Sequence, residues 1–339
     1  MTSDSKTVLA DKKFIMAIDV GVTNVKVGLV GKDAQIEHFA TRATPMEQGV
    51  GVVADALVST CRGVLADASL SIHDLAAVGC CVPGDVNPED GIITASAAPG
   101  WEGMDVRTPL EKSFGRQVTV EGDGEAATLT FFSFGPTRGQ DHLLGISIGT
   151  AITCGFITEG KILRGAGASA LMAGHIPLFL DGKPCNCGRK GCWEAYAGGG
   201  ALRRLLSEYQ QAGYKLPNLP EELAELAQAG EETSQKIWEE QGRLLGQGIA
   251  VLLDILNPKT VVLGGGFAQS WSLFKKSLIR TAREMALARN SEAAIVCAPN
   301  PEKAPLVGAA VAATKAQGLE DFFTEREEKA PQVEATGEV

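Results

Sequence analysis

The chain has 339 residues, a formal net charge of -10 and a hydrophobic content of 45%. This length is more than one average domain needs, so we expect two domains with sizeable cores. The negative charge argues against a nucleic-acid surface, which would need clustered basic residues. No apolar run reaches the roughly 18 residues that span a bilayer, and the N-terminus lacks a secretory signal. We therefore predict a cytoplasmic protein that acts on a small molecule, without nucleic-acid or membrane partners.

Strand and helix patterns alternate in the first part of the chain. Residues 14–19, 24–31 and 34–40 form a predicted meander of three strands separated by turns. The patterns that follow are a helix at 50–68, a strand at 75–82, a helix at 106–114 and a strand at 117–121. We predict an α/β N-terminal lobe over residues 14–135, preceded by an extension at 1–13.

The same opening recurs further along the chain. Residues 142–148, 151–158 and 161–163 predict a second three-strand meander. Helices at 201–212, 221–229 and 232–256, a strand at 260–263 and a helix at 267–288 follow. We predict a duplicated strand-meander core and a C-terminal lobe over residues 136–319, with its last helix packing back on the N-terminal lobe. Residues 320–339 are charged and predict a partly disordered tail.

Four candidate metal ligands lie within eighteen positions, namely His175, Cys185, Cys187 and Cys192. A cytoplasmic protein keeps its cysteines reduced, so a tight cluster indicates a metal site more than a disulfide framework. Three thiolates and one imidazole suit tetrahedral zinc. Because four ligands close the coordination shell, we predict structural zinc in a loop at residues 175–192 and disfavour a zinc that acts as Lewis acid.

Glycine-containing turns follow three of the predicted strands. Asp19, Gly21 and Thr23 stand in the first turn, where backbone N–H groups can approach a phosphate and Asp19 can hold Mg²⁺. Gly149 and Thr150 occupy the equivalent turn of the second meander. A third such place is the strand-to-helix connection at residues 264–266. Each turn taken alone could be a tight connection without a ligand. The recurrence of such turns after three strands favours nucleotide binding.

An acidic segment, Glu121-Gly122-Asp123-Gly124-Glu125, joins a strand to a helix between the two meanders. Acidic residues at a helix start are common capping groups. Phosphoryl transfer to a hydroxyl also needs a carboxylate that orients or accepts the hydroxyl proton. We predict that Asp123 is this group.

These motifs resemble the ROK family (repressor, open reading frame, kinase) of bacterial sugar kinases and related repressors. The resemblance extends over about residues 14–314, and its most specific part is Gly174-His175 followed by the string CNCGRKGCWE from Cys185 to Glu194. It implies an α/β, actin/hexokinase-like ATPase fold whose two lobes close around a sugar and Mg-ATP. It also implies a homodimer.

The resemblance further assigns roles to individual residues. Asp123 matches the general base, and His175 matches a residue that binds zinc with one ring nitrogen and faces the sugar with the other. Glu194 matches a ligand of the sugar hydroxyls. The nucleotide-binding matches are Asp19, Gly21, Thr23, Asn24, Gly149, Thr150, Gly264, Gly265 and Gly266.

Several positions depart from the family pattern. Gly122 stands where glucokinases of the family have Asn, and Met172 stands where they have Glu, so two hydrogen-bonding sugar ligands are missing. A site without these groups binds a polyhydroxylated sugar less well. Ala151 also brings a Cβ into the second phosphate turn. We therefore expect a sugar or sugar-like substrate other than plain glucose.

Two functions remain open from the sequence. The first is an ATP-dependent sugar kinase, since Asp19, Asp123 and Glu194 are all present. The second is a sugar-binding sensor of the same fold with weakened phosphoryl transfer. Thirteen residues precede Phe14 and contain no helix-turn-helix pattern, so we do not expect a DNA-binding repressor. ATP turnover across a panel of sugars would distinguish the two.

Overall fold

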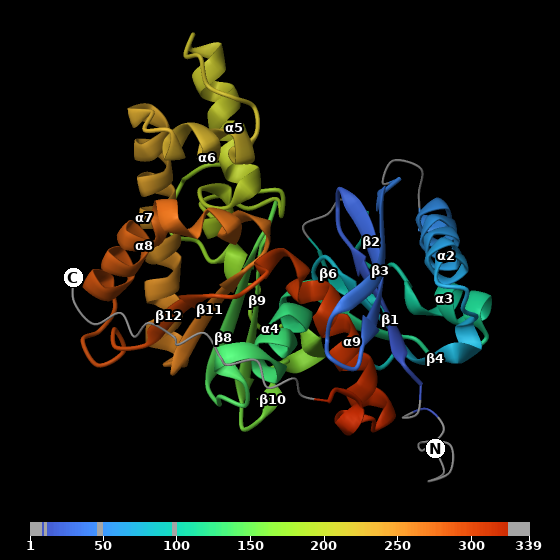
Figure 1. Cartoon of the computed structure of the whole chain (residues 1–339). Helices are drawn as coiled ribbons and strands as arrows, with labels where there is room; N and C mark the ends of the chain where they lie inside the picture. Colours follow the sequence, from blue (N-terminus) through green and yellow to red (C-terminus); the bar gives the residue numbers. More distant parts are fainter. Residues whose placement is uncertain (1–8, 10–11, 46–49, 97–99, 325–339) are drawn as a thin grey trace. The chain divides into compact units, whose positions relative to one another are not determined.

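The computed structural model describes residue 9 and residues 12–45, 50–96 and 100–324 (Figure 1). The described chain forms two compact units. Unit 1 contains the residues up to Arg138, Ile162–Ala170 and the residues from Lys303 on, whereas unit 2 contains Gly139–Lys161 and Leu171–Glu302. The continuous lobes expected from the sequence stay a prediction.

Unit 1 is built on a five-stranded sheet in the order β3-β2-β1-β4-β7. Its strands are β1 (Phe14–Val20), β2 (Asn24–Gly31), β3 (Ile36–Ala43), β4 (Leu75–Val82) and β7 (Thr119–Gly122). The meander β1–β2–β3 is antiparallel, whereas β4 lies parallel to β1 and to β7. A two-stranded ribbon of β5 (Asp85–Val86) and β6 (Ile93–Ala95) follows β4.

Helices cover both faces of this sheet because its central strands β1 and β4 are apolar on both sides. Met16 and Ile18 of β1 belong to a core formed with α2 (Val50–Asp67) and α3 (Arg107–Phe114), while Ile15 and Ala17 belong to a core formed with α9 (Ala304–Gln317). The Ala-rich α9 packs closely on the sheet, since a Cβ on Gly79 would lie 2.0 Å from the Ala309 oxygen. The same helix packs against α4 (Asp123–Ser133), as Figure 1 shows.

The second sheet has the corresponding order, β10-β9-β8-β11-β12. Its strands are β8 (Leu143–Ile148), β9 (Ile152–Thr158), β10 (Lys161–Ile162), β11 (Thr260–Gly264) and β12 (Ala294–Cys297). Strand β9 is antiparallel to β8, and β11 lies parallel to both β8 and β12. The helices of unit 2 are α5 (Gly199–Gln211), α6 (Pro220–Gln228), α7 (Glu232–Leu256) and α8 (Trp271–Met285). Their apolar residues share one core with the sheet.

The predicted α/β fold with a duplicated meander core is confirmed, with local differences. The helix expected at 267–288 starts only at Trp271, because residues Gly266–Ser270 form a 3₁₀ helix. Ordered structure also continues into the expected tail, since Phe322 is 2% exposed in the core around α9. Residues 325–339 of that tail lie outside the described residues. The sequence reading missed β5, β6 and β12, which have two to four residues each.

Candidate functional site

Two predicted site carboxylates lie at one edge of the unit 1 sheet. In the parallel register Asp19 pairs with Cys81, and the following pair is Val82 with Gly122, so β1, β4 and β7 end at the same edge. Asp123 directly follows β7. The buried Cys81 thiol lies 3.6 Å from Asp19 Oδ1. Burial raises the pKa of Cys81 well above its usual range, and the negative charges of Asp19 and Asp123 raise it further.

The turn between β1 and β2 holds Asp19 in a defined place. Asp19 is 7% exposed and accepts a hydrogen bond from Lys26 Nζ at 3.2 Å. Gly21 N donates to the Asn24 oxygen at 2.9 Å, and a Cβ on Gly21 would lie 2.8 Å from that oxygen. Only glycine fits so tight a turn without a shift. Thr23 and Asn24 are exposed at its tip.

The glycine turns of unit 2 lie at the ends of two neighbouring parallel strands. Ser147 of β8 pairs with Gly264 of β11, so the turn at Gly149 and the turn after Gly264 leave the sheet at the same edge. Gly265 has a φ of 81°, and its Cβ would lie 2.4 Å from the Ile148 oxygen. The close approach of these two turns therefore depends on glycine.

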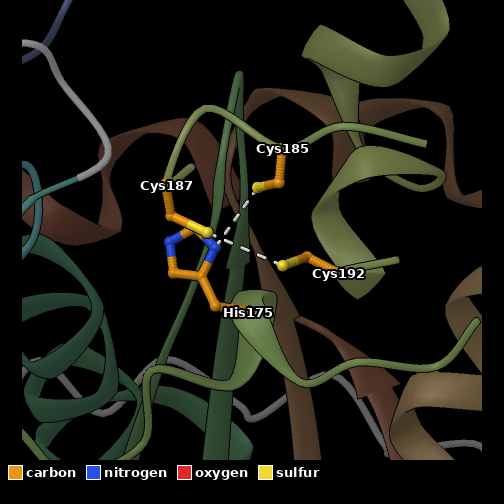
Figure 2. A group of neighbouring side chains, drawn as sticks. All are labelled: His175, Cys185, Cys187 and Cys192. Atoms are coloured by element: carbon orange, nitrogen blue, oxygen red, sulfur yellow. Dashed lines mark hydrogen bonds between the residues drawn. The ribbon is translucent and has the colours of Figure 1, made fainter. Parts of the chain in front are cut away.

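Four side chains meet in a cluster in unit 2 (Figure 2). His175 Nδ1 lies 3.5 Å from Cys185 Sγ, and Cys187 Sγ lies 3.6 Å from Cys192 Sγ. All four ligand atoms are within 4.8 Å of one another. Zinc bonds of about 2.0–2.3 Å in a tetrahedron put ligand atoms roughly 3.4–3.8 Å apart. The donor set and the spacing therefore fit zinc, with Nδ1 as the imidazole ligand.

The loop that carries the cluster is fixed to the core of unit 2 by Trp193. Trp193 is fully buried, and its Nε1 donates to the Leu244 oxygen of α7 at 2.9 Å. Its ring packs against α7 at Gly248, where a Cβ would lie 2.1 Å from a ring atom. The guanidinium of Arg189 also hydrogen-bonds Cys187, which favours the thiolate form that binds metal.

Glu194 lies beside the segment that contains His175. It is 7% exposed, and its Oε2 accepts a hydrogen bond from the Ile152 N–H at 2.9 Å. A Cβ on Gly174 would lie 3.3 Å from the same oxygen, so the segment just before His175 contacts Glu194. Met172, at the start of the 3₁₀ helix Ala173–His175, is half-buried.

Comparison with known proteins shows to which family the chain belongs. The model of the ROK family matches residues 15–316. The chain belongs to the ROK family. A glucokinase from Thermotoga maritima is 32% identical over 267 residues, covering 76% of this chain and 83% of the relative. A xylose repressor from Bacillus subtilis is 24% identical and covers 78% of this chain and 67% of the repressor.

Solved structures give the same fold for this ROK protein. The ROK family glucokinase from Streptomyces griseus, solved in complex with glucose and AMPPNP, superposes with a TM-score of 0.79 at 27% identity. The match covers 89% of this chain and 99% of that one. The actin/hexokinase-like fold expected from the sequence is thereby confirmed.

The structure arranges the predicted site residues of this ROK protein in two sets. Unit 1 holds the β1–β2 turn together with Gly122 and Asp123, and unit 2 holds the two glycine turns, the cluster and Glu194. In the part of the chain that the structure describes, no helix is long and apolar enough to cross a membrane.

Sequence reasoning missed residues that support both sets. Arg164 donates to both carboxylate oxygens of Glu121 at 2.7 Å, which fixes the end of β7 just before Asp123. Gly199 and Gly200 donate to the oxygens of Gly149 and Thr150 at 2.8 and 3.0 Å. The string Gly198-Gly199-Gly200 was a visible signal for the second contact. Nothing in the local sequence around Arg164 indicates its partner.

Proposed function

We propose that this ROK protein is an ATP-dependent sugar kinase in which Asp123 is the general base. The observation that carries the proposal is the position of Asp19 and Asp123 at one edge of the unit 1 sheet, on either side of β4. Phosphoryl transfer needs one carboxylate for the magnesium-bound phosphates and another for the acceptor hydroxyl. The glucokinase relatives support the same reaction class.

In the proposed reaction, Asp123 accepts the proton of a sugar hydroxyl as the hydroxyl oxygen attacks the γ-phosphorus of ATP. The bond from the γ-phosphorus to the bridging oxygen breaks, and ADP leaves with the electron pair. Asp19 would hold Mg²⁺, which offsets the negative charge of the phosphates. Gly21, Thr23 and Asn24 would contact the phosphates through the exposed tip of their turn.

Unit 2 would supply the remaining contacts. We assign the phosphates to Gly149 and Thr150, and the adenosine side to Gly264, Gly265 and Gly266. His175 Nδ1 would bind structural zinc with Cys185, Cys187 and Cys192, which leaves Nε2 for the sugar. Glu194 would accept hydrogen bonds from sugar hydroxyls, since its Oε2 is already anchored by a backbone N–H.

The substrate that we propose is a sugar or sugar-like molecule other than plain glucose. Gly122 and Met172 offer no polar side chain to a hydroxyl group. A hydroxyl left without a partner in a closed site costs binding energy, whereas an apolar or modified substituent beside Met172 would not.

The test is release of ADP from Mg-ATP with glucose, mannose, fructose, allose, their amino and N-acetyl forms and several cyclitols. We expect turnover with at least one modified sugar and weak turnover with glucose. Glucose as the best substrate would refute the specificity proposal while leaving the kinase intact. Bound sugar without ADP release across the whole panel would refute the kinase.

A sugar sensor is the second candidate, because the relatives include a xylose repressor. It predicts sugar binding by calorimetry with an unchanged affinity when Mg-ATP is omitted and when Asp123 is replaced by Asn. A kinase that closes on both substrates predicts that nucleotide tightens sugar binding.

We also propose that the protein is a cytoplasmic homodimer, as the family resemblance implies. Light scattering coupled to size-exclusion chromatography would give twice the 35.5 kDa mass of the chain. A mass near that of one chain would refute the dimer.

A further inference from the structure

Gly122 lacks a side chain although its backbone conformation does not require glycine. Its φ of -67° and ψ of 148° are open to any residue. The reason is steric, since a Cβ here would lie 2.2 Å from Glu125 Oε2 and 2.7 Å from the Gly84 oxygen. The carboxyl group of Glu125 therefore fills the space where a side chain of residue 122 would begin.

Glu125 reaches this space because of its place in α4. Gly122 caps the helix, and Glu125 stands three residues later, from where an acidic side chain folds back over the cap. Glu125 is only 6% exposed. Its carboxyl group thus lies next to the residue that directly precedes Asp123, whose Cα is about 3.8 Å from that of Gly122.

The groups around Glu125 are mostly acidic. Glu121 of β7 and Asp85 of β5 are 3% and 6% exposed, and Arg164 pairs with Glu121 through both oxygens. Asp123 adds a further negative charge, and Lys315 of α9 interacts with Glu121. Burial raises the pKa of Glu125 well above its usual range, and the charges of Glu121, Asp85 and Asp123 raise it further. These surroundings favour the protonated form of Glu125, which can both donate and accept a hydrogen bond.

We propose that Glu125 is a specificity-determining and positioning residue of the Asp123 site. Its carboxyl group takes the place of the side chain that Gly122 lacks, and so fixes the shape and polarity of the acceptor subsite beside Asp123. This inference rests on the proposed kinase function. According to this inference, two features determine the substrate preference. One is the buried carboxyl group of Glu125, and the other is the missing hydrogen-bonding side chain at residue 122.

The test compares Glu125→Gln, which resembles the neutral acid, with Glu125→Ala, which empties the space. Glu222→Ala, on the exposed first turn of α6, is the matched control. The measurement is kcat/KM for each sugar of the panel from pH 6 to pH 9. We expect Glu125→Gln to keep the wild-type order of substrates, and Glu125→Ala to lose about tenfold on the preferred sugar and change that order.

The pH dependence separates this role from a merely structural one. In the wild type, kcat/KM should fall once the pH is high enough to ionise Glu125 beside Asp123, and this fall should be absent in Glu125→Gln. The Cβ added by Gly122→Ala enters the same space from the other side. The losses in kcat/KM caused by Gly122→Ala and by Glu125→Ala should therefore be less than additive.

An unchanged substrate order in Glu125→Ala, with the same alkaline fall in Glu125→Gln, would overturn the inference while leaving the kinase standing. Loss of the substrate order in Glu125→Gln at pH 7 would also overturn it, because the neutral isostere would then have failed to replace the acid. A wild type that turns over no sugar would refute the proposed function and this inference with it.

Discussion

The two sheets of this ROK protein have corresponding strand orders but carry different chemistry at their strand ends. Two parallel strands of the unit 1 sheet carry carboxylates at their ends, with Asp19 next to the last residue of β1 and Asp123 directly after β7. Those of the unit 2 sheet end in glycine turns, at Gly149 after β8 and at Gly265 after β11. The same order of strands thus presents charged side chains at the strand ends of unit 1 and glycine turns without side chains at the strand ends of unit 2.

This difference between the strand ends matches the groups that each unit would contact in the proposed reaction. A carboxylate can bind a cation or accept a proton, but it repels a phosphate. A turn of glycines brings backbone N–H groups close to an anion without adding charge. We infer that unit 1 supplies the reacting and magnesium-binding groups, and that unit 2 supplies most of the neutral contacts to the nucleotide. The following variants test this division.

Asp123→Asn should have the largest effect, because it removes the proposed base and keeps the shape of the side chain. We expect kcat to fall by about 10²–10⁴-fold, while the dissociation constant of the sugar changes little. Turnover kinetics and calorimetry on the same preparations measure the two quantities. Asp55→Asn makes the same chemical change on the exposed face of α2 and should leave both unchanged. Equal losses in binding and turnover would contradict the role of Asp123 as base.

Cys187→Ser should act on unit 2 alone. Removal of one thiolate leaves three ligands, so we expect the protein to lose bound zinc and to unfold at a lower temperature. Metal analysis after dialysis and thermal unfolding are the measurements. Cys297→Ser changes a half-buried cysteine on β12, outside the cluster, and should keep its zinc. Full zinc content in Cys187→Ser would show that the cluster is not the metal site.

Gly265→Ala tests whether the glycine turns of unit 2 depend on a missing side chain. The added Cβ would lie 2.4 Å from the Ile148 oxygen, and the φ of 81° is unfavourable for alanine. We expect a loss of about 2 kcal/mol in the free energy of unfolding and weaker ATP binding. Gly266→Ala is the control for stability, because nothing would lie within 4 Å of a Cβ at Gly266. Similar stabilities of the two variants would contradict the steric argument.

The sequence predicted the fold well where periodicity is strong and contacts are local. Helix 232–256 agrees with α7 at both ends, since its apolar stripe is long and Asn257-Pro258 stops it. The meeting of His175 with the three cysteines was predictable because their spacing in the sequence is typical of a metal site. Contacts between distant segments were not predictable. An example is the hydrogen bond from Arg164 to Glu121, because these residues are 43 positions apart. The steric reason for Gly122 also needed coordinates, since only these show where the Glu125 carboxyl group lies.

Asp85→Asn tests how far burial of acids in unit 1 reduces stability. Burial raises the pKa of Asp85 from 3.8 to about 7, and the side chain accepts a hydrogen bond from Ser169. Among the described residues, none donates to its Oδ2. The folded protein therefore keeps a proton that the unfolded chain releases near pH 4, so the wild-type free energy of unfolding falls as pH rises from about 4 to about 7.

Asparagine has no proton to release, so the variant should lack this contribution to the pH dependence. The unfolding free energies of the two proteins should be similar near pH 4. The variant should gain up to about 4 kcal/mol relative to the wild type as pH rises through the folded-state pKa, with no further gain above about pH 8. Glu125 contributes a slope of the same sign in both proteins, so the difference between them reports on Asp85 and on its charge interaction with Glu125. A constant difference from pH 4 to pH 8 would mean that Asp85 is ionised in the folded protein, and that the carboxylates of unit 1 are better solvated than their burial implies.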